Sequence, residues 1–123
     1  MKQHSPGFLA LVTESKKRIK EIAPEDLKSK LDINEPLVLI DVREDNELPT
    51  GSIPGSIHLS KGIIERDIEQ KIPDLHTPII VYCSGGFRSA LVADALQKIG
   101  YTKVHSLVNG FKGWMDHGFN IQK

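Results

Sequence analysis

The twelve residues Ile79-Ile80-Val81-Tyr82-Cys83-Ser84-Gly85-Gly86-Phe87-Arg88-Ser89-Ala90 decide the fold class and hold the only cysteine of the chain. Four apolar residues follow Pro78, which is typical of a strand covered on both faces in a parallel sheet. Apolar positions then recur at helical spacing over residues 91–99, and Gly100 is a typical helix C-cap. The sequence therefore predicts that Cys83 lies at the carboxyl end of a buried strand, where ligands bind in open α/β sheets.

The rest of the chain repeats this alternation of strands and helices. A second apolar run, residues 37–40, predicts another buried strand, and weaker strand patterns cover residues 56–59 and 104–108. Helical patterns lie between and around them, at residues 25–31, 63–68 and 111–115. This alternation predicts an α/β fold with a mainly parallel sheet.

The segment before the first buried strand has a helical pattern of its own. From Phe8 to Ile22 apolar residues recur at helical spacing, with charged residues between them, and Pro24 follows. We expect an N-terminal extension at residues 1–21, loose at its start and helical from residue 8, ahead of a domain at residues 22–123. The helix either packs over the core or offers a surface to a partner.

The composition limits the range of functions. The chain has 123 residues, with 16 basic and 16 acidic side chains, and this balance argues against binding to a nucleic-acid backbone or an anionic membrane. No apolar run approaches the roughly 20 residues of a membrane span. A single cysteine cannot form an internal disulfide, which favours a reducing, cytoplasmic setting. The five histidines are scattered without metal-ligand spacing, so we expect no metal site.

The surroundings of Cys83 favour a reactive thiol over a buried, inert one. Gly85 and Gly86 allow a tight loop whose backbone N–H groups turn inward. The helix N-terminus adds partial positive charge and Arg88 adds a full one. We expect these groups to stabilise the thiolate, to lower the pKa of Cys83 and to form a small cradle for an anion carried on the sulfur.

The spacing of the loop distinguishes two kinds of cysteine chemistry. Cysteine phosphatases have five residues between the cysteine and the arginine, and that larger loop holds a tetrahedral phosphate. Only four residues separate Cys83 from Arg88, so the loop should close around something nearer to one sulfur atom. A relative of phosphatases or arsenate reductases remains an alternative that this spacing opposes.

Four segments in the right order resemble the single-domain sulfurtransferases of the rhodanese family. Leu39-Ile40-Asp41-Val42-Arg43-Glu44 is similar to the first strand and Asp-Val-Arg motif of the family, and Cys83 to Arg88 to its six-residue active loop. Gly51-Ser52-Ile53-Pro54-Gly55-Ser56-Ile57-His58-Leu59 and Val108-Asn109-Gly110-Phe111-Lys112-Gly113-Trp114 resemble its Pro-Gly turn and its closing segment. The resemblance implies a three-layer α/β/α domain.

The same resemblance implies a reaction. Cys83 would take sulfane sulfur from a donor such as thiosulfate, carry it as a persulfide, and pass it to cyanide or a thiol, without a metal or an organic cofactor. Apart from the resemblance, Asp41, Arg43 and Glu65 could support the site. For Asp41 and Arg43, which follow a buried strand, bracing of the loop is favoured over lining of the pocket mouth. For Glu65 and its neighbour Arg66, on a short predicted helix, a solvated helix face is as well supported as an approach to the loop. The residues expected to bind the substrate are Ser84, Gly85, Gly86, Phe87, Arg88 and Ser89.

A second interpretation of the same loop is a sulfur-relay or binding module. Arg88 is the only basic residue in the loop, and Phe87 at its rim favours an apolar or protein-borne donor. Such a module would accept persulfide sulfur from a partner protein and turn over small donors poorly. Fast turnover of thiosulfate would exclude it.

Overall fold

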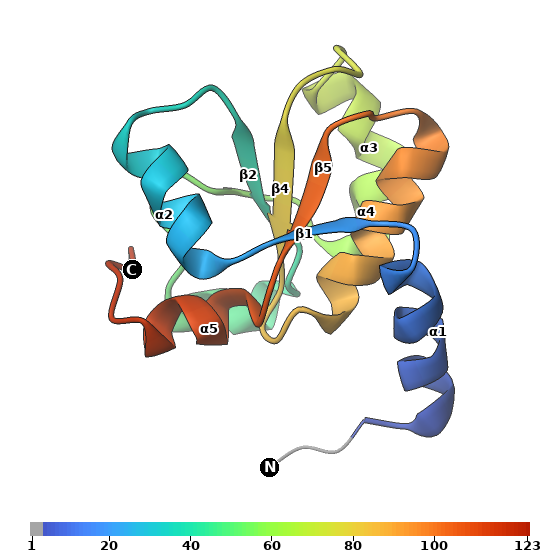
Figure 1. Ribbon diagram of the computed structural model, residues 1–123, viewed down its shortest axis with the longest axis horizontal. Helices are drawn as coiled ribbons and strands as arrows, with labels where there is room; N and C mark the ends of the chain where they lie inside the picture. The colour runs from blue at the N-terminus through green and yellow to red at the C-terminus, as the bar shows by residue number, and fades with distance from the viewer. Residues whose placement is uncertain (1–3) are drawn as a thin grey trace.

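Five parallel strands form one central sheet in the computed structural model, which describes residues 4–123 (Figure 1). The central strand β4 is buried at all four positions, as its uninterrupted apolar sequence requires. The strand order is β1-β5-β4-β2-β3. The strands are β1 (Lys20–Ile22), β2 (Val38–Asp41), β3 (Ile57–His58), β4 (Ile79–Tyr82) and β5 (Val104–Leu107).

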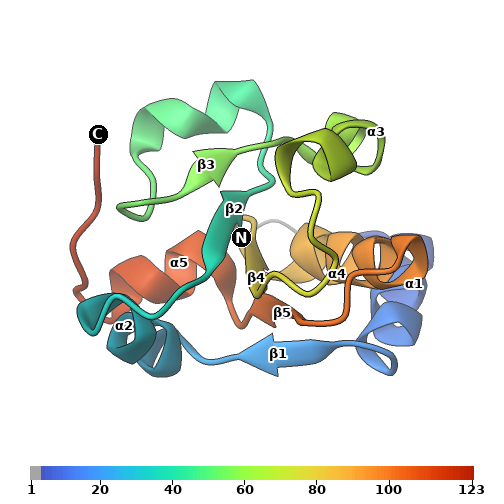
Figure 2. The ribbon, with the colours of Figure 1, turned by 90° about the horizontal axis from the view of Figure 1, so that it is seen from above.

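Helices cover both faces of this sheet, which confirms the predicted three-layer α/β/α fold (Figures 1 and 2). On one face lie α2 (Pro24–Asp32) and α5 (Gly110–Asp116). On the other lie α3 (Lys61–Lys71) and α4 (Phe87–Ile99), with α1 (Pro6–Lys16) outside α4. A 3-10 helix, η1 (Asp45–Thr50), connects β2 to β3.

The alternation of side chains along the strands produces two separate apolar cores. Ile80 and Tyr82 of β4 face α2 and α5, whereas Ile79 and Val81 face α3 and α4. Cys83 continues the second series, so its side chain points toward the α3 and α4 side of the sheet. The position of the thiol is therefore fixed by the register of the central strand.

The helix predicted from residue 8 to residue 21 is correct in kind but wrong in extent. It ends at Lys16, and residues 20–22 form the edge strand β1, which pairs with β5. The reason is that Ile19 packs into the core on the α4 side whereas Ile22 is buried in the other core, which one helical face cannot achieve. Residues 1–3 of the expected loose N-terminus lie outside the described residues.

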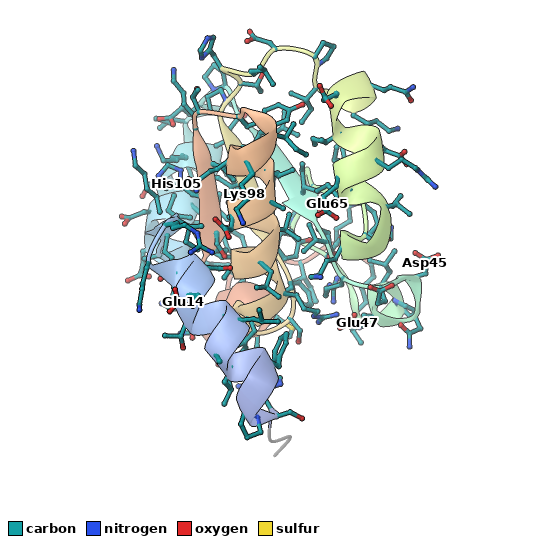
Figure 3. The ribbon with its side chains drawn as sticks, turned by 90° about the vertical axis from the view of Figure 1, so that its right-hand side faces the viewer. Glu14, Asp45, Glu47, Glu65, Lys98 and His105 are labelled. Atoms are coloured by element: carbon teal, nitrogen blue, oxygen red, sulfur yellow. The ribbon has the colours of Figure 1, made fainter. Side chains whose placement is uncertain are left out.

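The segment before residue 22 is packed against the domain rather than separate from it. Arg18 donates two hydrogen bonds to Asp94 of α4, from Nε to Oδ1 at 2.9 Å and from Nη2 to Oδ2 at 2.7 Å. The hydrogen bonds from Arg18 lower the pKa of Asp94. Val12 is buried where α1 crosses α4. Figure 3 shows the two helices side by side.

None of the helices formed by residues 4–123 has the length and apolar character needed to cross a bilayer.

The packing of α1 can be tested by truncating one buried side chain. Val12 is 3% exposed and Leu11, on the same helix, is 61% exposed. Val12→Ala should lower the free energy of unfolding by about 1–2 kcal/mol, because two buried methyl groups are lost. Leu11→Ala should change it by less than about 0.5 kcal/mol. Urea denaturation measures both, and equal effects would contradict the packing described here.

Candidate active site

The sulfur of Cys83 lies within a ring of hydrogen-bond donors at the N-terminus of α4. Its Sγ accepts the backbone N–H of Gly86 at 3.2 Å and that of Ser89 at 3.4 Å. Gly86 has a φ of 93°, a left-handed conformation that turns the chain into the helix. The Ser89 hydroxyl lies 3.6 Å from Sγ and hydrogen-bonds to Ser106 of β5 at 2.8 Å. This arrangement favours negative charge at the sulfur position.

Access to the sulfur is narrow. Cys83 is only 1% exposed, although the adjacent Ser84 is exposed. Apolar residues that include Val92 pack in the same core as the cysteine. A single sulfur atom at the end of a donor can therefore approach Sγ more easily than a tetrahedral phosphate group can.

The carbonyl groups of the loop are bound by α5, which turns them away from the sulfur. Phe111 N–H donates to the Cys83 carbonyl at 2.8 Å, and Lys112 N–H donates to the Ser84 carbonyl at 3.0 Å. This close approach requires Gly110, because a Cβ there would lie 2.4 Å from the Cys83 oxygen. The N-terminus of α5 thus fixes the orientation of the loop peptides.

Arg88 forms a bidentate ion pair with Glu47 of η1. Its Nη1 lies 2.6 Å from Oε2 and its Nη2 lies 2.8 Å from Oε1. The Glu44 N–H also donates to Glu47 Oε2, at 2.8 Å. Hydrogen bonds from Arg88 hold the pKa of Glu47 at about 2. The pKa of Arg88 is raised above its ordinary value, chiefly by its hydrogen bonds with Glu47.

Phe87 lies against the N-terminal segment of the chain. The His4 ring centroid lies 4.5 Å from the Phe87 centroid, and the Phe8 centroid lies 6.3 Å from it. Lys16 Nζ lies 5.7 Å from the same ring. The beginning of α1 therefore borders the Cys83 loop, a contact between segments about 80 positions apart in the sequence.

Asp41 and Arg43 brace the loop segment around η1 rather than line an opening. Both are buried, and Arg43 Nη2 lies 2.7 Å from Asp41 Oδ2 and 2.6 Å from the Gly51 carbonyl. The Arg43 guanidinium also lies 4.5 Å from the Phe111 ring centroid. This network joins β2, η1 and α5, so it supports the same helix that holds the Cys83 loop.

Glu65 is not brought to the loop. It is exposed on α3, and among residues 4–123 it forms no hydrogen bond or ion pair (Figure 3). The neighbouring Arg66 pairs with Asp67 instead. The side chains of Glu65 and Arg66 are exposed, in agreement with the alternative expectation of a solvated helix face.

One surface hollow lies away from Cys83. A cavity of about 250 Å³ at the amino ends of the strands is lined in part by Lys20, Lys30 and His105. Burial lowers the pKa of His105, and this side chain lies at the opposite end of the sheet from the sulfur. The candidate site is therefore defined by the donors around Sγ and not by a large cavity.

Comparison with known proteins agrees with this geometry. The family model described as "Rhodanese-like domain" matches residues 23–117. The chain belongs to the rhodanese-like family. The matched residues include the whole Cys83 loop, η1 and α5, and they begin within one residue of the end of β1.

The chain is similar to two curated proteins and to one solved structure, which carry different descriptions. It is 33% identical over 101 residues to the thiosulfate sulfurtransferase GlpE of Coxiella burnetii, which covers 82% of this chain and 89% of that protein. It is 33% identical over 102 residues to YrkF of Bacillus subtilis, a proposed sulfur carrier protein; the match covers 83% of this chain and only 54% of YrkF.

The solved structure is that of RPA3614 from Rhodopseudomonas palustris, a protein of unknown function described as a possible tyrosine phosphatase. It is 28% identical to this chain, with a TM-score of 0.84, and the likeness covers 99% of both chains. Coverage of this extent includes the N-terminal helix as well as the rhodanese-like domain.

Glu47, like Ser106, is a residue of this site that the sequence did not reveal. The spacing of Glu44 and Glu47 is that of a capping box, which the structure contains, and this signal could have placed Glu47 at a helix start. No local signal could have paired it with Arg88, because 41 positions separate them. The contact of Phe87 with α1 was missed for the same reason.

The close approach of α5 to the loop predicts a strong effect of Gly110→Ala. The new Cβ would overlap the Cys83 carbonyl, and the backbone there has a φ of 53°. We expect a loss of unfolding free energy above about 2 kcal/mol together with a displaced loop. The matched control is Gly118→Ala, which has a φ of 74° but open space around it, and should cost about 1 kcal/mol. Equal losses in urea denaturation would contradict the contact.

The ion pair predicts a pH-dependent contribution to stability. The pKa of Glu47 falls from 4.5 to about 2 on folding, so the stabilisation is complete above pH 4.5 and is lost as the pH falls toward 2. The wild-type protein should exceed Glu47→Gln in unfolding free energy at pH 7, and this gap should close between those two values. Urea denaturation at several pH values measures the gap. A gap that stays constant over this range would contradict the prediction.

Proposed function

We propose that this protein is a sulfurtransferase that carries sulfane sulfur on Cys83 as a persulfide. Its family membership supports a role in sulfur transfer at the coarser level. The observation that carries the finer proposal is the pair of backbone N–H groups, from Gly86 and Ser89, directed at Sγ. Donors in this position stabilise a thiolate, the form of cysteine that attacks a sulfur atom.

The reaction has two displacement steps. In the first, the Cys83 thiolate attacks the outer sulfur of thiosulfate, the S–S bond of the donor breaks, and sulfite leaves with the electron pair of that bond. In the second, cyanide or a thiolate attacks the outer sulfur of the persulfide, and Cys83 leaves as the thiolate. Thiocyanate or a new persulfide is released, and no external oxidant or reductant is needed.

The loop residues have separate roles in this scheme. The peptide groups of residues 84–89 would bind the outer sulfur as it gains negative charge, since such donors act most strongly in a site that excludes water. The Ser89 hydroxyl would accept a hydrogen bond from the thiol or donate one to the thiolate. Arg88 would hold the loop through Glu47. A reducing, cytoplasmic setting would keep the single cysteine available.

A sulfur relay is the second candidate. The observation that favours it is that the single cation of the loop is already paired with Glu47, which leaves little attraction for an anionic small donor. The resemblance to the proposed carrier YrkF is consistent with it. In that case Cys83 would exchange persulfide sulfur with a partner protein and would turn over thiosulfate slowly.

A phosphatase activity is opposed by two features of this chain. Four residues rather than five separate Cys83 from Arg88, and Cys83 is almost completely buried. Hydrolysis of an aryl phosphate that is lost in Cys83→Ala would support this activity.

Mass spectrometry tests the proposed function directly. Wild-type protein, reduced, desalted and then incubated with thiosulfate or a persulfide donor, should gain about 32 Da, one sulfur atom, and lose it on treatment with a reductant. Cys83→Ser should gain nothing, because a hydroxyl does not form a stable persulfide analogue. Absence of the adduct in the wild-type protein with every sulfane donor would refute the proposal.

A further inference from the structure

The charge of Arg88 is compensated more completely than its position next to the active cysteine would suggest. Both of its terminal nitrogens are bound by Glu47, and the Glu47 carboxylate is itself held by the Glu44 N–H. Glu44 is exposed on the same segment, and its negative charge also acts on Arg88. The combined formal charge of Arg88, Glu47 and Glu44 is therefore negative.

Within residues 4–123, two further cations near the loop are also paired with acidic groups. Arg43 lies 2.7 Å from Asp41. Lys16, next to Phe87, lies 3.7 Å from Glu21. The rim itself is aromatic, formed by Phe87 with His4 and Phe8. A donor that approaches Cys83 therefore meets aromatic surface and compensated charge.

We propose that Glu47 is a selectivity-determining residue, which disfavours dianionic sulfur donors such as thiosulfate and favours persulfide donors that carry at most one negative charge. The inference rests on the proposed function of Cys83. Glu47 acts through Arg88 and does not itself contact the reacting atoms.

The physical basis is the Coulomb interaction with the donor. When the Glu47 carboxylate is bound to the Arg88 guanidinium, it cancels most of the attraction of the guanidinium for a dianion. This cancellation is largest where the charges are partly shielded from water. The side chains of Arg88 and Glu47 are 28% and 29% exposed, so solvent screens their interaction only in part. The pKa of Glu47, at about 2, keeps its negative charge in place throughout the neutral range.

The favoured donor reacts by a balanced displacement. The Cys83 thiolate attacks the outer sulfur of a hydropersulfide, RS–SH, the S–S bond of the donor breaks, and the thiolate RS⁻ leaves with its electron pair. The Cys83 hydropersulfide that forms carries the proton of the donor. This leaving group has one negative charge, whereas the sulfite released from thiosulfate has two, so only thiosulfate depends strongly on a free cation.

The test compares two donors in wild-type protein and in Glu47→Gln, with cyanide as the acceptor. The glutamine keeps an oxygen that accepts from Arg88 but removes the charge. With thiosulfate, kcat/KM should rise about tenfold, mainly through a lower KM, and should fall more steeply with ionic strength than in the wild-type protein. With 2-hydroxyethyl hydropersulfide, kcat/KM should change by less than about threefold.

The matched control is Asp45→Asn. Asp45 is a carboxylate on the same 3-10 helix as Glu47 (Figure 3). Its side chain is 92% exposed, and it lies 3.8 Å from His58 Nδ1 rather than against Arg88. This variant removes the same charge, and the ratio of the two donors should stay within about twofold of the wild-type ratio. If Glu47→Gln folds poorly, Glu44→Gln provides a second variant, with a smaller shift in the same direction.

The outcomes separate this inference from the proposed function. A donor ratio that is unchanged in both Glu47→Gln and Glu44→Gln, while Cys83 still takes up sulfur, would overturn the role of Glu47 alone. An equal loss of activity with both donors would indicate that Glu47 only braces the loop through Arg88. That result would also overturn its role in donor selectivity. No sulfur uptake by the wild-type protein would refute the proposed function itself.

Discussion

The hydrogen bonds from main-chain N–H groups to the sulfur of Cys83 are the constraint around which the site is built. Backbone donors can point at one atom only if the neighbouring carbonyl groups point elsewhere, and each buried carbonyl then needs a partner. The first turn of α5 supplies those partners, at Cys83 and Ser84. The Cys83 loop is thus a junction between two helix N-termini, one directed at the sulfur and the other at the carbonyls.

This junction explains why elements far apart in the sequence converge on one end of the sheet. Asp41 and Arg43 hold η1 in place, and Arg43 also contacts the ring of Phe111, so β2 and α5 support each other. Glu47 on η1 then reaches Arg88 on α4. The loop is therefore held from both sides, by η1 through Glu47 and by the first turn of α5.

The sequence was informative wherever the determinants were local. The apolar run of β4, the glycine pair and the helical pattern after Arg88 lie within about twenty residues, so they correctly predicted a buried strand, a tight loop and a helix. The end of the first helix was not predictable in this way, because Ile19 and Ile22 have helical spacing but pack into different cores. The partner of Arg88 was likewise set by tertiary structure.

The contact of α1 with Phe87 has a practical consequence for work with this protein. The His4 ring lies 4.5 Å from the Phe87 ring, so a purification tag or fusion partner joined ahead of that histidine would add residues on the Phe87 side of the Cys83 loop. A fusion at the C-terminus would be attached at a different place, because Gln122 forms a β-bridge with Ser52, on the segment between η1 and β3. The choice of attachment point can therefore alter measured catalysis without any change in the amino acids of the loop.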